Sequence, residues 1–456
     1  MLTLTIRRAR HIFVTPVGLI VICLLLGTGA GGAVFAKSIS TNTGNGLQFT
    51  RQARIGFQSG DDWEPSIAAD RYGHIYTLFK HYDVAGGQTC FHCDLHLLLQ
   101  RSDDGGNSWS APRALTPNYP VNGGQYDPQI MVDPVDGRTL WASFLQNTNS
   151  LIAVMKSTDF GETWGAPVLV STRPPGLDKD ELAVRSNEIV VAYDDNLNTW
   201  ATISRDGGET WTTREVFPTS DRFSISLSAG AAIDSHGNIF ISWDSFDKAH
   251  SNLGNGPATV WVSKSTDFGK TWTRTVINVS GAPPACNNCG YAYLSSQMAL
   301  RIGSDDTIYL LWNSTVDQTN FAPERIFFAR STNDGNSYSA RVDISDAPAG
   351  VEHCFPAIAV GQQDGNVRIG WMDKRAARWN VFFRQSSDGG ENFSSTVQIS
   401  SFVPGYPYLH PNGFGSPYGD YFSMVVDQNN QTQMVFGEAP SYQGPGNQWV
   451  SHSLDD

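Results

Sequence analysis

Acidic residues recur where short apolar stretches begin, and they are the side chains of this chain best suited to proton transfer. Asp127, Asp180 and Glu352 stand at such places, and Tyr421 begins the last of these stretches. Carboxyl groups that crowd together raise one another's pKa. Such a pair can serve as the acid and base of glycoside hydrolysis, or bind a cation. We therefore take these four residues as candidate acid, base or nucleophile.

Aromatic and charged residues at these places, and in the loop after the second strand of the sixth repeat unit, could bind a substrate. Aromatic faces beside carboxylates suit the C–H and O–H groups of sugars. Two other interpretations stay open, because single acids can cap strand ends and aromatic side chains can fill gaps between sheets. The substrate-binding candidates are Trp63, Glu64, Tyr126, Arg375, Arg378, Trp379 and Asp420.

Cysteine spacing suggests local cross-links. Cys90 and Cys93 form one Cys-x-x-Cys pair, and Cys286 and Cys289 form a second, which leaves Cys354 over as a buried thiol. Outside the cytoplasm each pair would form a disulfide, whereas four thiolates together could hold zinc. The sequence requires no cofactor, and it leaves room for a bound cation, calcium or zinc.

One motif recurs along most of the chain and has the chemistry of a turn. Its form is Ser-x-Asp-x-Gly-x-Thr-Trp. A short Asp side chain accepts backbone N–H groups ahead of it, and glycine adopts the left-handed conformation. The intervals between the copies indicate a propeller or solenoid. The third positions, which we expect to be structural, are Asp104, Asp159, Asp206, Asp267, Asn333 and Asp388.

This motif resembles the Asp box, or BNR repeat, of sialidases and related β-propellers. The resemblance covers roughly residues 50–456 and implies an all-β fold, a single β-propeller of four-stranded blades that we expect over residues 47–456. Counting repeat units favours seven blades over six, the number in classical sialidases. The seventh unit has three strands, and residues 47–55 could supply its fourth. Such closure would leave no sheet edge free.

The family also implies a site, which this chain matches only in part. Sialidases carry an Arg-Ile-Pro near the first inner strand, where three arginines hold the sialic acid carboxylate. Here Trp63-Glu64-Pro65 takes that place, so the Arg is missing and Glu64 has the opposite charge. Tyr421 matches the position of the family's Tyr nucleophile. We expect a sialidase-like scaffold without a recognisable arginine triad.

Charge and the N-terminus limit the partners. The chain has 31 basic and 44 acidic residues, a net charge of −13, which excludes nucleic acid as a partner. Arginines at positions 7, 8 and 10 precede an uncharged stretch that ends at Ala36. Residues 1–36 thus resemble a signal peptide or an N-terminal membrane anchor, and residues 37–46 a flexible spacer. We expect a secreted or membrane-anchored protein with its propeller outside the cytoplasm.

These patterns predict an exported sialidase-like propeller that acts on or binds glycans or glycoconjugates. If it is an enzyme, the resemblance implies a glycoside hydrolase of the exo-sialidase type. The alternatives are a non-catalytic extracellular propeller that binds protein or glycan, and a surface protein stabilised by metal or disulfides.

Overall fold

The computed structural model describes most of the chain beyond residue 46. The described residues are 39–40, 47–56, 60–82, 96–117, 124–147, 149–171, 176–195, 198–217, 223–247, 257–282, 297–401, 415–417, 421–441 and 445–454.

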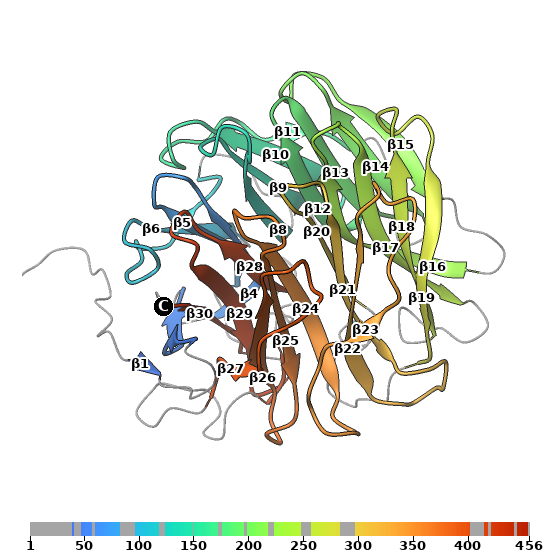
Figure 1. The fold of residues 1–456 in the computed structure, drawn as a ribbon. Helices are drawn as coiled ribbons and strands as arrows, with labels where there is room; N and C mark the ends of the chain where they lie inside the picture. The colour runs from blue at the N-terminus through green and yellow to red at the C-terminus, as the bar shows by residue number, and fades with distance from the viewer. Residues whose placement is uncertain are drawn as a thin grey trace, which may run out of the picture. The chain divides into compact units, whose positions relative to one another are not determined.

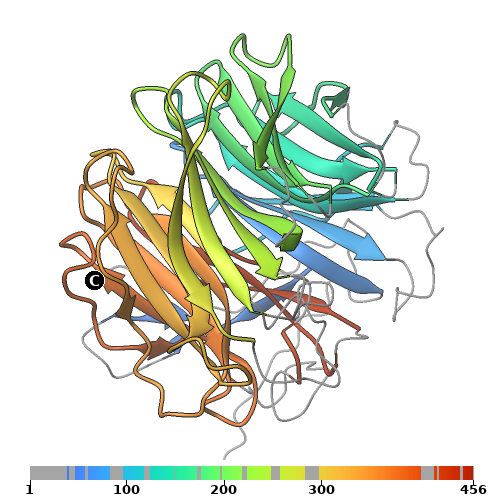
Figure 2. The same cartoon turned by 90° about the vertical axis from the view of Figure 1, so that its right-hand side faces the viewer.

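Seven four-stranded antiparallel sheets make up the structure, and they follow one another in chain order (Figure 1). The first strand of each sheet contacts the first strands of the two neighbouring sheets, and the first strand of the last sheet contacts that of the first. Figure 2 shows the same blades turned by 90°. The predicted all-β, seven-bladed propeller is confirmed.

Each blade runs from an inner strand, which contacts the neighbouring blades, to an outer strand. Blade 1 consists of β4 (Asp61–Ala69), β5 (Ile75–Tyr82), β6 (His96–Ser102) and β7 (Arg113–Ala114). Blade 2 consists of β8 (Gln125–Val132), β9 (Leu140–Gln146), β10 (Leu151–Ser157) and β11 (Val168–Leu169). Blade 3 consists of β12 (Asp178–Arg185), β13 (Glu188–Asp194), β14 (Thr199–Ser204) and β15 (Thr212–Phe217). Blade 4 consists of β16 (Phe223–Ile233), β17 (Ile239–Asp247), β18 (Ala258–Ser265) and β19 (Thr273–Ser280).

The remaining blades follow the same scheme. Blade 5 consists of β20 (Met298–Ile302), β21 (Ile308–Thr315), β22 (Glu324–Ser331) and β23 (Val342–Asp343). Blade 6 consists of β24 (His353–Val360), β25 (Val367–Asp373), β26 (Asn380–Ser386) and β27 (Val397–Gln398). Blade 7 consists of β28 (Phe422–Val426), β29 (Thr432–Glu438), β30 (Asn447–His452) and β3 (Ala53–Ile55).

Blade 7 is completed by the N-terminal part of the propeller. Strand β3 pairs antiparallel with β30, with Ala53 opposite Val450 and Ile55 opposite Gln448. The predicted closure is therefore confirmed, and it joins the two ends of the propeller chain within one sheet.

The N-terminal predictions lie almost wholly outside the described residues. The expected signal peptide or anchor, residues 1–36, belongs there, as do residues 37–38 and 41–46 of the expected spacer. The remaining spacer residues, β1 (Ile39–Ser40), pair with β2 (Phe49–Thr50). Within the described ranges, no helix is long and apolar enough to cross a membrane.

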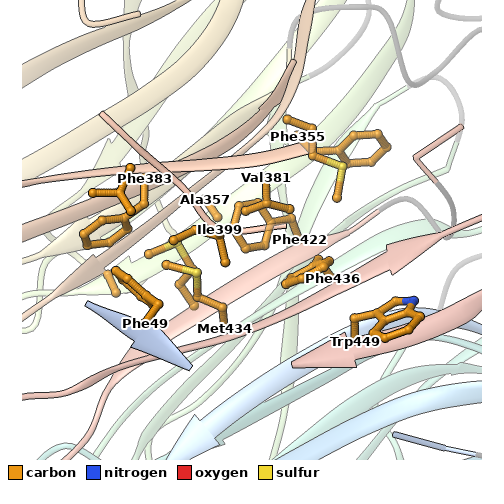
Figure 3. Packing of buried hydrophobic residues seen from close by; sticks show 14 of the residues in the cluster. Phe49, Phe355, Ala357, Val381, Phe383, Ile399, Phe422, Met434, Phe436 and Trp449 are labelled. Carbon is orange, nitrogen blue, oxygen red and sulfur yellow. The ribbon is translucent and has the colours of Figure 1, made fainter. Parts of the chain in front are cut away.

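The hydrophobic core is divided among the junctions between neighbouring blades. The cluster between blades 6 and 7 includes Phe355, Phe383, Phe422 and Trp449. In Figure 3 the Phe422 ring lies beside that of Phe436, with 6.2 Å between the ring centres. Phe49, which precedes β3, enters the same cluster, so the N-terminal segment contributes packing as well as strand pairing.

Each repeated motif forms the same turn in the structure. In blade 2 the Ser157 hydroxyl donates to Asp159 and accepts the N–H of Gly161. The Asp159 carboxylate also accepts the N–H and the hydroxyl of Thr163, at 2.9 and 2.6 Å. The aromatic residue that ends the motif, here Trp164, packs against the core between its own blade and the preceding one. The turn therefore links a strand connection to a blade junction.

Candidate functional site

Four inner strands begin with the same β-bulge. Each bulge contains a non-glycine residue with positive φ: Glu64 (55°), Asp127 (49°), Lys179 (51°) and Phe355 (51°). A left-handed residue other than glycine costs about 1–3 kcal/mol and persists only where its surroundings hold it. This repeated strain lies at the end of the propeller where the sequence predicted the site.

The bulges are tied to one another by side chains. The N–H of Asp127 donates to Glu64 Oε2 at 2.8 Å, across the junction of blades 1 and 2. The N–H of Lys179 donates to Asp127 Oδ2 at 3.2 Å, across the junction of blades 2 and 3. The N–H of Phe355 donates to Gln297 Oε1 at 3.2 Å between blades 5 and 6. In all three cases an acceptor on one blade holds the strained residue of the next.

Residues from all seven blades line a cavity of about 90 Å³ at this end of the ring. Glu181 of blade 3, Arg301 of blade 5 and Tyr421 of blade 7 are among them. A second cavity of about 130 Å³ shares Glu181 and Arg301, so the two side chains stand between the cavities. We call the first of these the axial cavity.

Opposite charges face each other in the axial cavity. Burial raises the pKa of Glu181 to about 7, and the nearby charges of Arg301 and Lys179 limit the rise. Burial lowers the pKa of Arg301, and Glu181 opposes this effect. The Lys179 ammonium lies 5.0 Å from the centre of the ring of Tyr421, which lines the cavity, so side chains of blades 3 and 7 meet here. The site combines a carboxyl group poised near neutral pH with a fixed cation.

Asp180 is buried next to this cavity. Its Oδ2 accepts the hydroxyl of Ser143, and its Oδ1 has no hydrogen-bond partner among the described residues. Burial first, and then the charges of Asp127 and other acids, raise its pKa well above the usual value, against the effect of Ser143. Burial therefore favours the protonated form of Asp180, and this side chain has no exposed surface with which to touch a substrate.

A second group of carboxyls lies between blades 5 and 6. The N–H of Glu324 donates to Glu352 Oε1 at 3.1 Å, and the side-chain amide of Asn313 donates to the fully buried Glu324 carboxyl. Burial raises the pKa of Glu352 to about 7, and the Glu324 N–H and the Lys374 charge oppose the rise. Burial and the neighbouring Glu352 raise the pKa of Glu324 well above its usual value. Both carboxyls can therefore hold protons near neutral pH.

The four candidate acid, base or nucleophile residues thus fall into separate places. Asp127 and Asp180 interact within blades 2 and 3, and Tyr421 stands at the axial cavity beside Lys179. Glu352 belongs to the second carboxyl group, with Glu324. Of the four, Tyr421 lines the cavity, whereas the carboxylate of Asp127 is engaged with the backbone of blade 3.

Two aromatic candidates enclose a lysine. The fully buried Lys80 ammonium lies 3.0 Å from the ring centre of Tyr126, 4.1 Å from that of Tyr82 and 5.9 Å from that of Trp63. Cation–π attraction of this kind strengthens when the cation is desolvated. Trp63 and Tyr126 therefore pack around Lys80, and Glu64 holds the N–H of Asp127.

The candidates in blade 6 are engaged within the fold. Arg375 donates to Asp373 and to Asp346, the latter at 2.7 Å. Trp379 is 1% exposed and belongs to the core between blades 6 and 7, because its ring packs inward. Arg378 is partly exposed. Asp420 lies outside the described residues.

The sequence places Glu181 at this end of the propeller without predicting it as an acid or base, and it does not single out Arg301, Lys80 or Glu324. A usable signal existed for Arg301, because it is the one charged residue in the otherwise apolar strand β20. Glu181 directly follows Asp180, and spacing alone does not tell which of two adjacent acids lines the ring axis.

The cysteine pairs Cys90–Cys93 and Cys286–Cys289 lie outside the described residues, and Cys354 is a buried free thiol. A possible cation site is present elsewhere: one ligand atom each from Asp234, His236 and Asp334 lie within 4.8 Å of one another. Asp334 is part of the fifth Asp box, so this group lies at the opposite end of the blades from the axial cavity.

This chain is similar in fold to solved structures, and part of it is similar in sequence to a curated protein. No protein-family model matches the chain. Xyloglucanase Xgh74A of Acetivibrio thermocellus is 25% identical over 293 residues, which is 58% of this chain and 32% of that protein. The chain thus spans about a third of the length of the curated relative it matches.

Solved structures with 12% sequence identity share the fold. A polysaccharide lyase of family PL25, an ulvan lyase, gives a TM-score of 0.54 over 87% of this chain and 95% of its own. Sialidases are also among the similar structures. One of them, the Hadza microbial sialidase Hz136, gives a TM-score of 0.44 over 87% of this chain and 66% of its own. At this identity the likeness concerns the fold alone, and the chain is similar in fold to a solved polysaccharide lyase.

Proposed function

We propose that this propeller binds glycans over the axial cavity and cleaves them there as a glycoside hydrolase-like enzyme. The observation that carries the proposal is Glu181, whose pKa is raised to about 7 inside a cavity lined by all seven blades. A general acid or base works best when its pKa is near the working pH. Tyr421 and Arg301 supply a hydroxyl and a charge at the same cavity.

The charges favour a neutral sugar over sialic acid. Arg301 is the arginine that lines the axial cavity within the described part of the chain, and Glu181 offsets its charge. A single balanced arginine does not make the three-arginine clamp that a sialic acid carboxylate requires. The local similarity to a xyloglucanase and the shared fold with a polysaccharide lyase support a glycan substrate.

The size of the cavity favours a second candidate function, glycan binding without cleavage. About 90 Å³ is the liquid volume of about three water molecules. A cavity of this size accepts a substituent of a sugar, so the sugar rings would rest on the mouth formed by Lys179 and Tyr421. In that case Glu181 and Arg301 would hold a hydroxyl group.

One set of assays separates the two candidates. The protein is tested for hydrolysis of neutral polysaccharides, aryl glycosides and sialosides, together with Glu181→Gln and Tyr421→Phe. We expect both variants to lose about 100-fold or more in turnover of a neutral glycan. Asp334→Asn, at the other end of the blades, is the matched control. If no substrate is turned over and Tyr421→Ala abolishes binding on a glycan array, the protein is a binding propeller. Neither turnover nor binding would refute both proposals.

We also propose that the chain acts outside the cytoplasm. The arginine-led, uncharged N-terminal segment supports this location. Fractionation of cells that express the full chain tests it, and recovery of the whole population in the cytoplasm would contradict it.

A further inference from the structure

The bulges of blades 1, 2 and 3 form a continuous connection that ends at the axial cavity. The connection runs from Glu64 Oε2 to the N–H of Asp127, and from Asp127 Oδ2 to the N–H of Lys179. Lys179 reaches the Tyr421 ring, and Glu181, two residues on, lines the cavity. Each of the three linking residues has positive φ, so each needs an external contact to hold its conformation.

We infer that Glu64 and Asp127 are positioning residues, which set the placement of Lys179 and Glu181 at the axial cavity through this chain of hydrogen bonds. The inference deepens the proposed function and rests on it for its catalytic meaning. The Glu64 carboxylate accepts the N–H of Asp127, and Pro65 and Ser66, which follow Glu64 in the chain, line the axial cavity. The hydrogen bond to Asp127 is the route by which we expect the Glu64 carboxylate to act on Lys179.

Burial supports this role. Glu64 is 6% exposed and Asp127 is 4% exposed, so neither carboxylate is available to hold an external ligand. A carboxylate that accepts a backbone N–H makes a charge-assisted hydrogen bond, which is stronger than a neutral one. The N–H of Lys179 also donates to Asp178 Oδ1 at 3.0 Å, so Asp127 shares this donor with an acceptor on the same strand.

The electrostatics give a way to separate positioning from direct charge effects. Arg301 and Lys179 lower the pKa of Glu181 and Asp127 raises it, with the buried Asp180 adjacent in sequence. Removing Asp127 therefore acts on Glu181 directly. Glu64 is not one of these charges. Its charge raises the pKa of Asp180 and of Tyr126 instead. A change at Glu181 after substitution of Glu64 would report the hydrogen-bonded connection.

The test uses Glu64→Ala and Glu64→Asp in the full chain, with two independent readouts. Glu64→Asp keeps the charge but withdraws the acceptor from the Asp127 N–H, so it serves even if the alanine variant does not fold. Hydrogen exchange followed by mass spectrometry should show about tenfold or faster exchange in peptides that contain Lys179, the factor for losing a hydrogen bond to a charged group. Carbon-13 NMR of labelled glutamate should show the Glu181 midpoint falling below about 7, because Asp127 is no longer held beside it.

Two further variants are controls. Glu64→Gln keeps an acceptor oxygen and should restore both readouts to the values of the unchanged protein. Gln297→Ala breaks the equivalent contact between blades 5 and 6, and should leave Lys179 exchange and the Glu181 midpoint unchanged. Unaltered exchange and midpoint in Glu64→Asp would overturn the inference, and so would failure of Glu64→Gln to restore them.

Turnover is measured in parallel, so that failure of the enzyme proposal can be distinguished from failure of the positioning inference. If the protein cleaves a glycan, Glu64→Asp should shift the pH profile of kcat in the direction of the Glu181 midpoint. If no glycan is cleaved, the enzyme proposal fails, and the exchange and titration results still decide whether Glu64 positions Lys179 and Glu181.

Discussion

At the scale of single residues, the Asp-box carboxylates are held by a small set of local contacts. Asp159 accepts the Ser157 hydroxyl and both the N–H and the hydroxyl of Thr163. These hydrogen bonds lower its pKa to about 2, with the Thr163 hydroxyl as the largest cause. The charge is therefore part of the turn, and the residue is not a candidate for catalysis.

Asp159→Ala should destabilise the propeller by about 1–3 kcal/mol, because several hydrogen bonds to a charged group are lost together. Asp159→Asn should cost less. In blade 5 an Asn already fills the equivalent position, where Asn333 accepts the N–H of Ser337 and donates to its hydroxyl. Urea denaturation at pH 7 measures both differences. Equal losses in the two variants would show that the amide cannot replace the carboxylate here.

The same pair has a pH signature. A carboxyl with a lowered pKa in the folded state contributes stability above its unfolded pKa, and this contribution is lost as the pH falls toward about 2. The advantage of the unchanged protein over Asp159→Asn should therefore shrink between about pH 4 and pH 2. Denaturation curves across this range check the sign, and an advantage that grew on acidification would contradict it.

The sequence predicts the turn of the Asp box but not the residues that meet in the axial cavity, for a physical reason. The box is made by residues within eight positions, so the spacing of these residues is enough to predict the geometry of the turn. The pairing of Glu181 with Arg301 joins blades 3 and 5 and depends on which side chains face the ring axis. The bulge at Lys179 directly precedes Glu181, and no simple alternation predicts a bulge.

At the scale of elements, the segment that contains β3 closes the ring both by strand pairing and by packing. Strand β3 pairs with β30, while Leu47 and Phe49, just before it, enter the core between blades 6 and 7 (Figure 3). The sequence predicted this closure because the last repeat unit lacked a fourth strand. Counting strands was sufficient here because a three-stranded last blade would leave the edge of its third strand unpaired.

A chain that begins at Leu47 should therefore keep the stability of the full chain, whereas one that begins at Gly56 should lose cooperative unfolding or aggregate. The longer form retains β3 and its core residues, and the shorter form exposes the edge of β30 and leaves a gap beside Trp449. Thermal unfolding followed by circular dichroism, with light scattering, measures the difference. Equal midpoints for the two forms would mean that closure adds nothing to stability.

Packing at the blade junctions could be predicted in kind but not in detail. Aromatic side chains can fill gaps between sheets, and Trp109 and Trp164, which end two of the boxes, do so at successive junctions. The sequence predicts Trp379 as a substrate-binding residue, but it packs in the core. Whether an aromatic ring turns inward depends on the neighbouring blade, which sequence spacing does not show.

At the scale of the whole molecule, the acids form two populations with opposite effects on stability. Box carboxyls such as Asp159 have lowered pKa values. The acids at the other end of the blades, among them Asp180, Asp244 and Glu324, have pKa values raised by burial. The net charge of −13 therefore does not describe how the protein responds to pH.

The carboxyls with raised pKa values determine how the stability of the protein changes above pH 5. A carboxyl whose folded pKa exceeds its unfolded value binds more protons in the folded state, so stability falls as the pH rises from its unfolded pKa through its folded pKa. Glu181 and Glu352, with pKa values of about 7, place part of this loss between about pH 5 and pH 7. The protein should thus be most stable on the acidic side of neutrality, above the range in which the boxes lose their charge.

We predict that the thermal midpoint falls by at least a few degrees between pH 5.5 and pH 8, and that the variant with both Asp244→Asn and Glu324→Gln flattens this dependence. Each amide replaces a buried carboxyl that titrates with a raised pKa by a group that does not titrate. In both carboxyls one oxygen, Asp244 Oδ1 and Glu324 Oε1, has no hydrogen-bond partner among the described residues. The double variant should accordingly be more stable than the unchanged protein at pH 8 and close to it at pH 5.5. Differential scanning calorimetry at both pH values measures the four midpoints. A midpoint that rises toward pH 8 in the unchanged protein would mean that the buried acids are compensated by cations, since only a bound positive charge would reverse the sign.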